Sequence, residues 1–308
     1  MNNTFIQSSY KNKIARISLK IVIVFTVLVL MMLTTASIYV HYNKEKIIAK
    51  IKEQVYNNVR GEVHIKNIDI AVWSSFPYIA AQLNNVSLLD SHFHTPLLNA
   101  AEISCKINLL QLLGKVHDIA KVRIANGSFH LFTDSLSYSN AYLLRKKDTA
   151  SSASSSSSSI TIHNINLENV SALIENVPKQ KRYEFHFSSL KAHIDKTDSI
   201  LEIELDENCF VKGLGFYLAK GIYLQNHTVN TANCSLKFNT ATRELTFDKT
   251  SFDINHHIYF VQGKFHFRDS SFFQLHIQTK DIQYKQAMKV LTERIQNKLA
   301  MVALKEPF

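Results

Sequence analysis

The chain of 308 residues contains few of the residues that build disulfide frameworks and tight loops, with 3 cysteines, 4 prolines and 7 glycines. Cys105, Cys209 and Cys234 lie among alternating apolar residues, where cysteine usually serves as a small buried hydrophobe. Two of them could still pair in an oxidising compartment. The cysteine content therefore implies no disulfide framework.

The common catalytic motifs are also missing, since the sequence has no glycine-rich phosphate loop, G-x-S-x-G, C-x-x-C or H-E-x-x-H. Histidine is abundant, but the pairs His92/His94 and His256/His257 lack the Asp, Glu or Cys partners of a metal site. Four more alternate with apolar residues, as on the solvated face of a strand: His64, His130, His186 and His266. We therefore expect no enzyme, no metal and no cofactor.

The net charge of +10 is not gathered into a nucleic-acid-binding patch. Four basic residues precede the longest apolar segment, and the others are scattered, with no Lys/Arg run beyond residues 145–147. This distribution indicates a solvated surface, so we expect no nucleic-acid partner.

Residues 21–40 form the longest apolar segment and contain no charge, proline or glycine. At about 1.5 Å per residue, a helix of this length covers about 30 Å, the thickness of a bilayer's hydrocarbon core. The segment is therefore predicted to be a membrane anchor. The anchor residues are Ile21, Val24, Leu28, Leu30, Met32 and Ile38.

Charge on either side of this segment predicts its orientation. Lys11, Lys13, Arg16 and Lys20 precede it, and the first acidic residue is Glu45, so we expect a cytoplasmic N-terminus and the remainder on the far side. A cleavable signal peptide is the alternative, because residues 35–37 are small. The apolar run exceeds a signal core of about 7–15 residues, which favours a retained anchor.

A second helix is predicted over residues 44–59, ending at Gly61. Its apolar stripe could lie on the membrane surface or cap the end of the following domain, and the capping role is favoured. A related hypothesis makes this helix the mouth through which a lipid enters. The residues of that mouth are Ile47, Ile51, Val55 and Val59.

From Glu62 onward the apolar residues recur with a period of two, which is typical of strands with one apolar face. A slip at Lys66 and Asn67 indicates a bulge or turn. Short polar segments at residues 125–127, 239–242 and 268–271 are predicted turns, and their spacing favours antiparallel meanders. The fold class is therefore mainly β, with a long antiparallel sheet.

Three segments depart from the strand pattern. Residues 109–114 are predicted to form a helical turn, residues 151–159 a serine-rich linker, and residues 281–303 an amphipathic helix. The expected organisation is a basic cytoplasmic tail (1–20), an anchor (21–40), an amphipathic helix (41–60), a membrane-proximal β region (61–148), a linker (149–159), a distal β region (160–280) and a C-terminal helix (281–308).

The order of these parts resembles the AsmA family. The resemblance rests on the anchor, Gly61, residues 73–77 (WSSFP) and residues 83–88 (LNNVSL). It continues in the distal residues 242–247 (TRELTF), 261–263 and 281–282. A further block spans residues 97–134 and is carried by Leu97, Leu98, Ala100, Ile103, Leu109, Leu112, Leu113, Gly114, Lys115, Val122, Ile124, Gly127 and Leu131.

Two positions depart from the family pattern. Asn140 falls where the family often has the Asn of a G-x-x-N turn, but Ser137 replaces the glycine. Family members also usually continue for several hundred residues past a helix like the last one here. The chain is therefore expected to be either a short paralogue or a truncated reading frame.

The resemblance implies a bacterial inner-membrane protein with its bulk in the periplasm, similar to TamB and chorein bridge proteins, whose curved sheets form a groove for phospholipid acyl chains. Phospholipids and envelope proteins at the distal end are then the expected partners. A scaffold or adaptor that influences outer-membrane protein assembly and protein targeting to the membrane is the alternative function. The candidate groove residues are Ile103, Cys105, Ile107, Val122, Ile124, Phe129, Leu131, Leu236 and Phe238.

The strand pattern by itself does not distinguish a groove from a closed fold. A β-sandwich or a closed barrel also has one apolar face per strand, and in those folds that face is the protein's own core. Both architectures therefore stay open at this point.

Overall fold

The computed structural model of the chain describes residues 3–71, 78–108, 118–144, 161–267, 272–279 and 288–299. Three predicted segments, residues 109–114, 151–159 and 268–271, lie outside this range, as does the WSSFP segment of residues 73–77.

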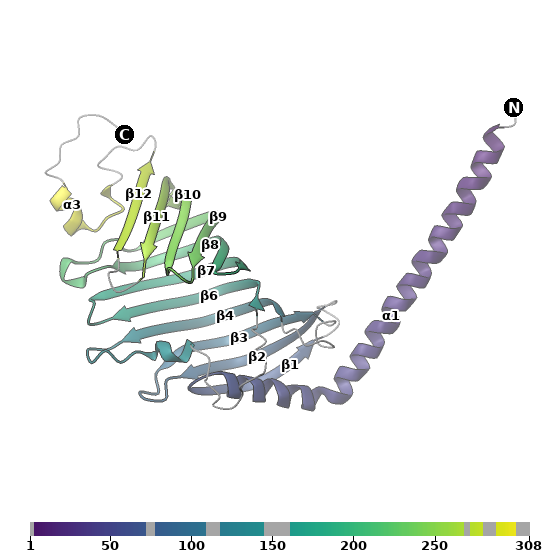
Figure 1. Cartoon of the computed structure of the whole chain (residues 1–308), viewed down its shortest axis with the longest axis horizontal. Helices are drawn as coiled ribbons and strands as arrows, with labels where there is room; N and C mark the ends of the chain where they lie inside the picture. The colour runs from purple at the N-terminus through teal and green to yellow at the C-terminus, as the bar shows by residue number, and fades with distance from the viewer. Residues whose placement is uncertain are drawn as a thin grey trace.

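A single helix, α1 (Asn3–Asn58), joins the predicted anchor to the predicted amphipathic helix without a break. Its first part extends away from the sheet, and its last turns run beside the first strand (Figure 1). Residues 22–57 are long and apolar enough to cross a membrane, judged by length and composition. Gly61 follows the helix with φ of 96°, which accounts for the predicted stop.

Over the described ranges, the remaining elements are one large sheet, two short 3₁₀ helices and a short helix near the C-terminus. The helices are η3 (Asn140–Leu144), η4 (Leu218–Lys220) and α3 (Glu293–Leu299). The strands are β1 (Glu62–Ala71), β2 (Tyr78–Leu89), β3 (Pro96–Asn108), β4 (Asp118–Thr133), β5 (Thr161–Ile162), β6 (Asn164–Asn176), β7 (Lys181–Thr197), β8 (Ile200–Gly215), β9 (His227–Asn239), β10 (Glu244–Ile254), β11 (His257–His266) and β12 (Phe272–Thr279).

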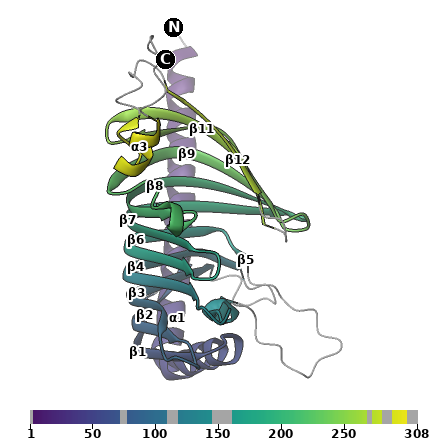
Figure 2. The same ribbon diagram turned by 90° about the vertical axis from the view of Figure 1, so that its left-hand side faces the viewer.

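The strands pair in chain order from β1 to β12, except that β4 pairs with β6 and the two-residue β5 lies off this path. Figure 2 shows them stacked as a single curved layer. Within the described residues the sheet is open, because β1 and β12 each have one paired neighbour. The open sheet agrees with the predicted mainly β class and differs from a two-sheet sandwich or a closed barrel.

One part of the sheet corrects the prediction of a wholly antiparallel meander. β4 pairs with β6 in parallel, and β5 pairs in parallel with the start of β4 at Asp118 and Ile119. The reason is that the connection after β4 returns the chain to the start of that strand before β6 begins. The proximal and distal β regions are therefore halves of one continuous sheet.

A line of irregular residues crosses the sheet. Asn85, Asn126 and Asn169 have φ of 49°, 52° and 53° inside β2, β4 and β6, a conformation that asparagine tolerates better than most residues. The register is the same on either side of each one. Residues 125–127, predicted as a turn, are therefore an irregularity within β4.

These positive-φ residues keep the apolar side chains on one face of the sheet where the apolar–polar alternation is broken. At each slip two consecutive residues lie on the polar side, so the apolar residues before and after it return to the same face. Leu83 and Val86, which flank Asn85, accordingly pack in one cluster with Ile68. In a regular strand, a break in the alternation would move the following apolar residues to the polar face. The irregular residue at each break prevents this, so one face stays apolar across the sheet.

The predicted C-terminal helix is interrupted within the residues that the structure describes. Before α3, Leu291 makes a β-bridge with Leu224, and the backbone N–H of Thr292 donates to the Tyr223 carbonyl. Residues 281–287 and 300–303 of the predicted helix lie outside the described ranges. Pairing with residues 223–224 thus interrupts the helical spacing read from the sequence. The turn predicted at residues 239–242 is confirmed, since β9 ends at Asn239 and β10 begins at Glu244.

Candidate functional site

Among the residues that the structure describes, no second sheet covers the apolar side of the sheet. Cross-strand pairing aligns its residues in rows, with Ile103 opposite Ile124 and Ile124 opposite Leu167. One row from β1 to β7 consists of Ile68, Leu83, Ile103, Ile124, Leu167 and Leu190. We refer to this surface as the apolar face.

Most predicted groove residues lie on the apolar face and are half-buried. Cys105 pairs with Val122 beside the Ile103–Ile124 pair, so β3 and β4 present four of them together. Half-burial is what a single layer produces, since each side chain contacts its neighbours in the sheet and, over the described ranges, no second sheet lies against it. The half-buried set is Ile103, Cys105, Val122, Ile124, Phe129, Leu131, Leu236 and Phe238. Ile107 pairs with Ile119 through the backbone, and its side chain lies outside the description.

The end of the apolar face next to β1 is covered by α1. Ile48 and Ile51 of the helix pack against Ile68, Leu83 and Val86. The predicted mouth residues Ile47, Ile51, Val55 and Val59 are all half-buried. The apolar stripe of the helix thus takes up the capping position, and the same helix continues into the anchor.

The anchor residues point outward from α1. Val24, Leu28 and Ile38 are 64%, 61% and 57% exposed, and Leu30 and Met32 are exposed as well. A continuous apolar surface of this kind is unfavourable in water and favourable in the hydrocarbon core of a bilayer. Ile21 belongs to the helix, and its side chain lies outside the description. The helix fits a single-pass membrane anchor.

The opposite face of the sheet is polar and carries ion pairs across the strands. Arg123 on β4 donates from Nη1 to Glu102 Oε1 on β3 at 2.6 Å and from Nε to Glu168 Oε1 on β6 at 2.8 Å. The hydrogen bond from Arg123 lowers the pKa of Glu168 more than burial raises it. This arrangement joins three strands across the parallel β4–β6 pair.

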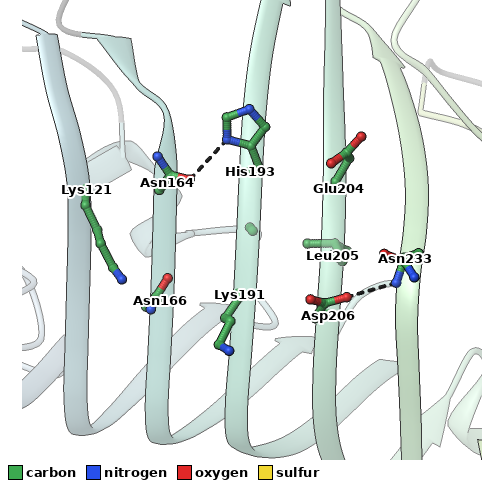
Figure 3. A pocket seen from close by; sticks show the side chains of 10 residues that line it. Lys121, Asn164, Asn166, Lys191, His193, Glu204, Leu205, Asp206 and Asn233 are labelled. Carbon is green, nitrogen blue, oxygen red and sulfur yellow. Dashed lines mark hydrogen bonds between the residues drawn. The ribbon is translucent and has the colours of Figure 1, made fainter. Parts of the chain in front are cut away.

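A shallow hollow of about 360 Å³ lies on this polar face (Figure 3). His193 Nδ1 lies 3.0 Å from Asn164 Oδ1, and the backbone N–H of Asn233 donates to Asp206 Oδ1 at 2.9 Å. Lysines line β4 and β7 while carboxylates line β8, so the hollow does not favour a ligand of one charge. Its polar lining residues are Lys121, Asn164, Asn166, Lys191, His193, Glu204, Asp206 and Asn233.

A buried carboxylate near the α1 end was missed by sequence reasoning. Asp90 is 0% exposed and accepts hydrogen bonds from the Tyr138 hydroxyl, the Tyr142 hydroxyl at 2.8 Å and the Phe93 N–H at 2.7 Å. Burial raises its pKa, but these hydrogen bonds outweigh burial and hold the pKa below its ordinary value. Asp90 thereby ties the β2–β3 loop to the segment that leads into η3.

Next to Asp90, the side chain of Asn140 completes the turn that the family pattern indicated. Its Oδ1 accepts from the Phe132 N–H at 3.0 Å, and its Nδ2 donates to the His130 carbonyl at 2.8 Å. Ser137 has φ of 65°, the left-handed region that favours glycine. The serine therefore occupies the glycine's place in the turn with some backbone strain.

The residues considered for catalysis or metal binding are dispersed. His94 lies 3.4 Å from Glu62, and His130 lies 3.0 Å from Glu175. All three cysteines are free, and burial raises the pKa of Cys105 to about 11 and that of Cys209 to about 12. Over the described ranges, no three His, Cys, Asp or Glu side chains group in a way that could hold a metal ion.

Taken together, these features define a class: a protein with a long apolar N-terminal helix and a sheet that has one apolar face and one ion-paired face. The model of the AsmA family matches residues 10–289, so the chain belongs to the AsmA family. Neither the curated proteins nor the solved structures include a significant match.

Proposed function

We propose that this AsmA-family chain holds phospholipid acyl chains on its apolar face and so supports lipid homeostasis of the outer membrane. The observation that carries the proposal is an apolar row that stays in register from β1 to β7 and is half-buried from β3 to β7. Each CH₂ kept from water is worth about 0.8 kcal/mol, so acyl chains gain by lying on it.

The connection of this face to the anchor supports a route from the bilayer. α1 leaves the membrane and covers the β1 end of the apolar face through Ile48 and Ile51. Lipid entering beside these residues would reach the face without crossing water. The task requires no nucleophile or metal, and accordingly we propose no enzymatic activity.

The proposed location is the bacterial inner membrane, with the N-terminus in the cytoplasm and the sheet in the periplasm. The basic residues before the anchor support this orientation. An epitope tag at the N-terminus should resist protease added to spheroplasts, while the sheet region should be cleaved. Cleavage of the N-terminal tag together with protection of the sheet region would indicate the opposite topology and contradict the proposal.

Photo-crosslinking at two adjacent positions of β4 tests the lipid role. Val122 lies on the apolar face, whereas Lys121 lines the hollow on the polar face. A photoreactive residue at 122 in the full chain should form adducts with acyl chains, and the same residue at 121 should not. Equal labelling at both positions would contradict the proposal.

The same experiment distinguishes lipid handling from the alternative scaffold or adaptor function. Adducts at 122 that contain protein and no lipid would mean that the apolar face docks a partner chain, as an adaptor would require. Lipid adducts at 122 with no protein adducts support lipid handling.

A further inference from the structure

An acidic side chain interrupts one row of the apolar face at β8. Glu207 pairs with Leu190 on β7 and with Thr231 on β9, so it continues the row that begins at Ile68. On its own strand it shares the apolar phase with Leu205 and Cys209. The row is apolar on the β1 side of Glu207 and more polar beyond it.

Among the described residues, no positive charge pairs with Glu207. Cys209 and Cys234 are 2% and 3% exposed, and the negative charge of Glu207 adds to burial in raising the pKa of both thiols. Burial also raises the pKa of Glu207 itself. Its carboxyl has no hydrogen bond or ion pair with any residue that the structure describes.

The groups that face Glu207 from neighbouring elements are uncharged. β7 contributes Leu190, β9 contributes Thr231 and the neutral thiol of Cys234, and further along the row lies the Tyr259 phenol on β11. The other acids of β8 lie on the polar face, where Glu202 pairs with Lys237 at 3.1 Å and Glu204 is exposed. Glu207 therefore lies on the opposite face of the sheet from the other acidic residues of β8.

We infer that Glu207 is a proton-dependent barrier that divides this row of the apolar face into a membrane-side part, β1 to β7, and a distal part, β9 to β12. This rests on the proposed acyl-chain function. When ionised, the carboxylate keeps its hydration water, and a hydrocarbon chain cannot cover it without removing that water. When protonated, the neutral carboxyl lets acyl chains lie across β8.

The test measures acyl-chain occupancy on both sides of Glu207 in the full chain reconstituted in phosphatidylethanolamine liposomes. Photoreactive residues replace Leu167 on β6 or Phe252 on β10, two positions in the same row at equal strand separation from β8. The readout is the ratio of distal to membrane-side lipid adducts. Lowering the pH from about 8 to about 4.5 should raise this ratio about tenfold.

Substitutions assign the effect to Glu207. Glu207→Gln, which keeps the size of the side chain, should give the high ratio at both pH values, and Glu207→Leu should do the same. Glu204→Gln on the polar face is the matched control and should keep the native pH dependence. Circular dichroism of each variant checks that the sheet is intact.

The outcomes separate the barrier from the proposed function. A native ratio that does not change with pH, or a Glu207→Gln chain that keeps the dependence, would overturn the barrier while leaving lipid binding in place. An absence of acyl adducts at 167 in every chain would overturn both.

Discussion

Two regions of the apolar face differ in how they are covered. At the α1 end, Ile68, Leu83 and Val86 are 2%, 8% and 5% exposed, as in an ordinary protein core. Across β3 to β7, Ile103, Ile124 and Leu167 belong to the same row and remain half-buried. The same residue types thus serve as packed core at one end and as an open surface in the middle.

This difference shows where the stability of the sheet comes from. The covered end gains from burial under α1 and from the Asp90 hydrogen bonds, whereas the open stretch depends on strand pairing and on ion pairs behind it on the polar face. An open stretch held in shape without a cover is suited to a removable ligand. The predictions below probe each contribution, from the largest expected effect to the smallest.

The covered end should respond most to truncation of its core. Ile68→Ala should lower the free energy of unfolding by about 3–4 kcal/mol, because it removes buried methylenes beneath Ile48 and Ile51. Ile124→Ala, at a half-buried position of the open stretch, should cost about 1 kcal/mol. Urea unfolding of the full chain in detergent, followed by far-UV circular dichroism, measures both. Equal losses would remove the distinction between the two regions.

Gly61 is the next most sensitive position of the covered end. An added Cβ would lie 2.6 Å from the Leu89 carbonyl oxygen and would clash with the Leu143 side chain, at a φ of 96°. Gly61→Ala should therefore cost about 3 kcal/mol. The same urea titration checks the value, and Gly213→Ala, where an added Cβ meets only ordinary contacts with Ile222, is the matched control.

Asp90 should make the covered end sensitive to acid. Asp90→Asn should cost about 2 kcal/mol near neutral pH, since it removes a charged acceptor of three hydrogen bonds. Because the folded-state pKa is lowered, this stabilisation is complete above the unfolded value of about 4 and is lost as the pH falls through the folded value. Free energies of unfolding measured as a function of pH should show this loss of stabilisation in the native chain and not in Asp90→Asn.

The polar face behind the open stretch should contribute least per residue. Arg123→Met should cost about 1 kcal/mol, because the guanidinium is partly exposed and solvent screens its pairing with Glu102 and Glu168. High salt should reduce the difference between the native chain and the variant. A loss as large as that of Ile68→Ala would mean that the ion pairs, and not α1, hold the sheet together.

The strands and their apolar residues could be predicted from the sequence because alternation is a local signal. The Asn126 segment was misread as a turn, since a left-handed asparagine before a glycine has the same local pattern inside a strand as between strands. Only the pairing of β4 with β3 and β6 on either side distinguishes the two, and that information is not local. The parallel β4–β6 pair was missed for the same reason.

The site residues show the same limit. Asp90 resembles a turn residue because its partners, Tyr138 and Tyr142, lie 48 and 52 positions away. Glu207, by contrast, left a local signal, because it occupies an apolar phase between Leu205 and Cys209. Reading the phase of charged residues along each strand would have identified it.

The central claim is that the apolar face binds lipid, and native mass spectrometry of the full chain released from nanodiscs tests it most directly. The comparison uses two chains that gain a carboxyl at adjacent positions of β4, Val122→Glu on the apolar face and Lys121→Glu on the polar face. The account predicts that the native chain and Lys121→Glu retain the same number of phospholipids and that Val122→Glu retains fewer. Equal retention by all three chains would contradict it.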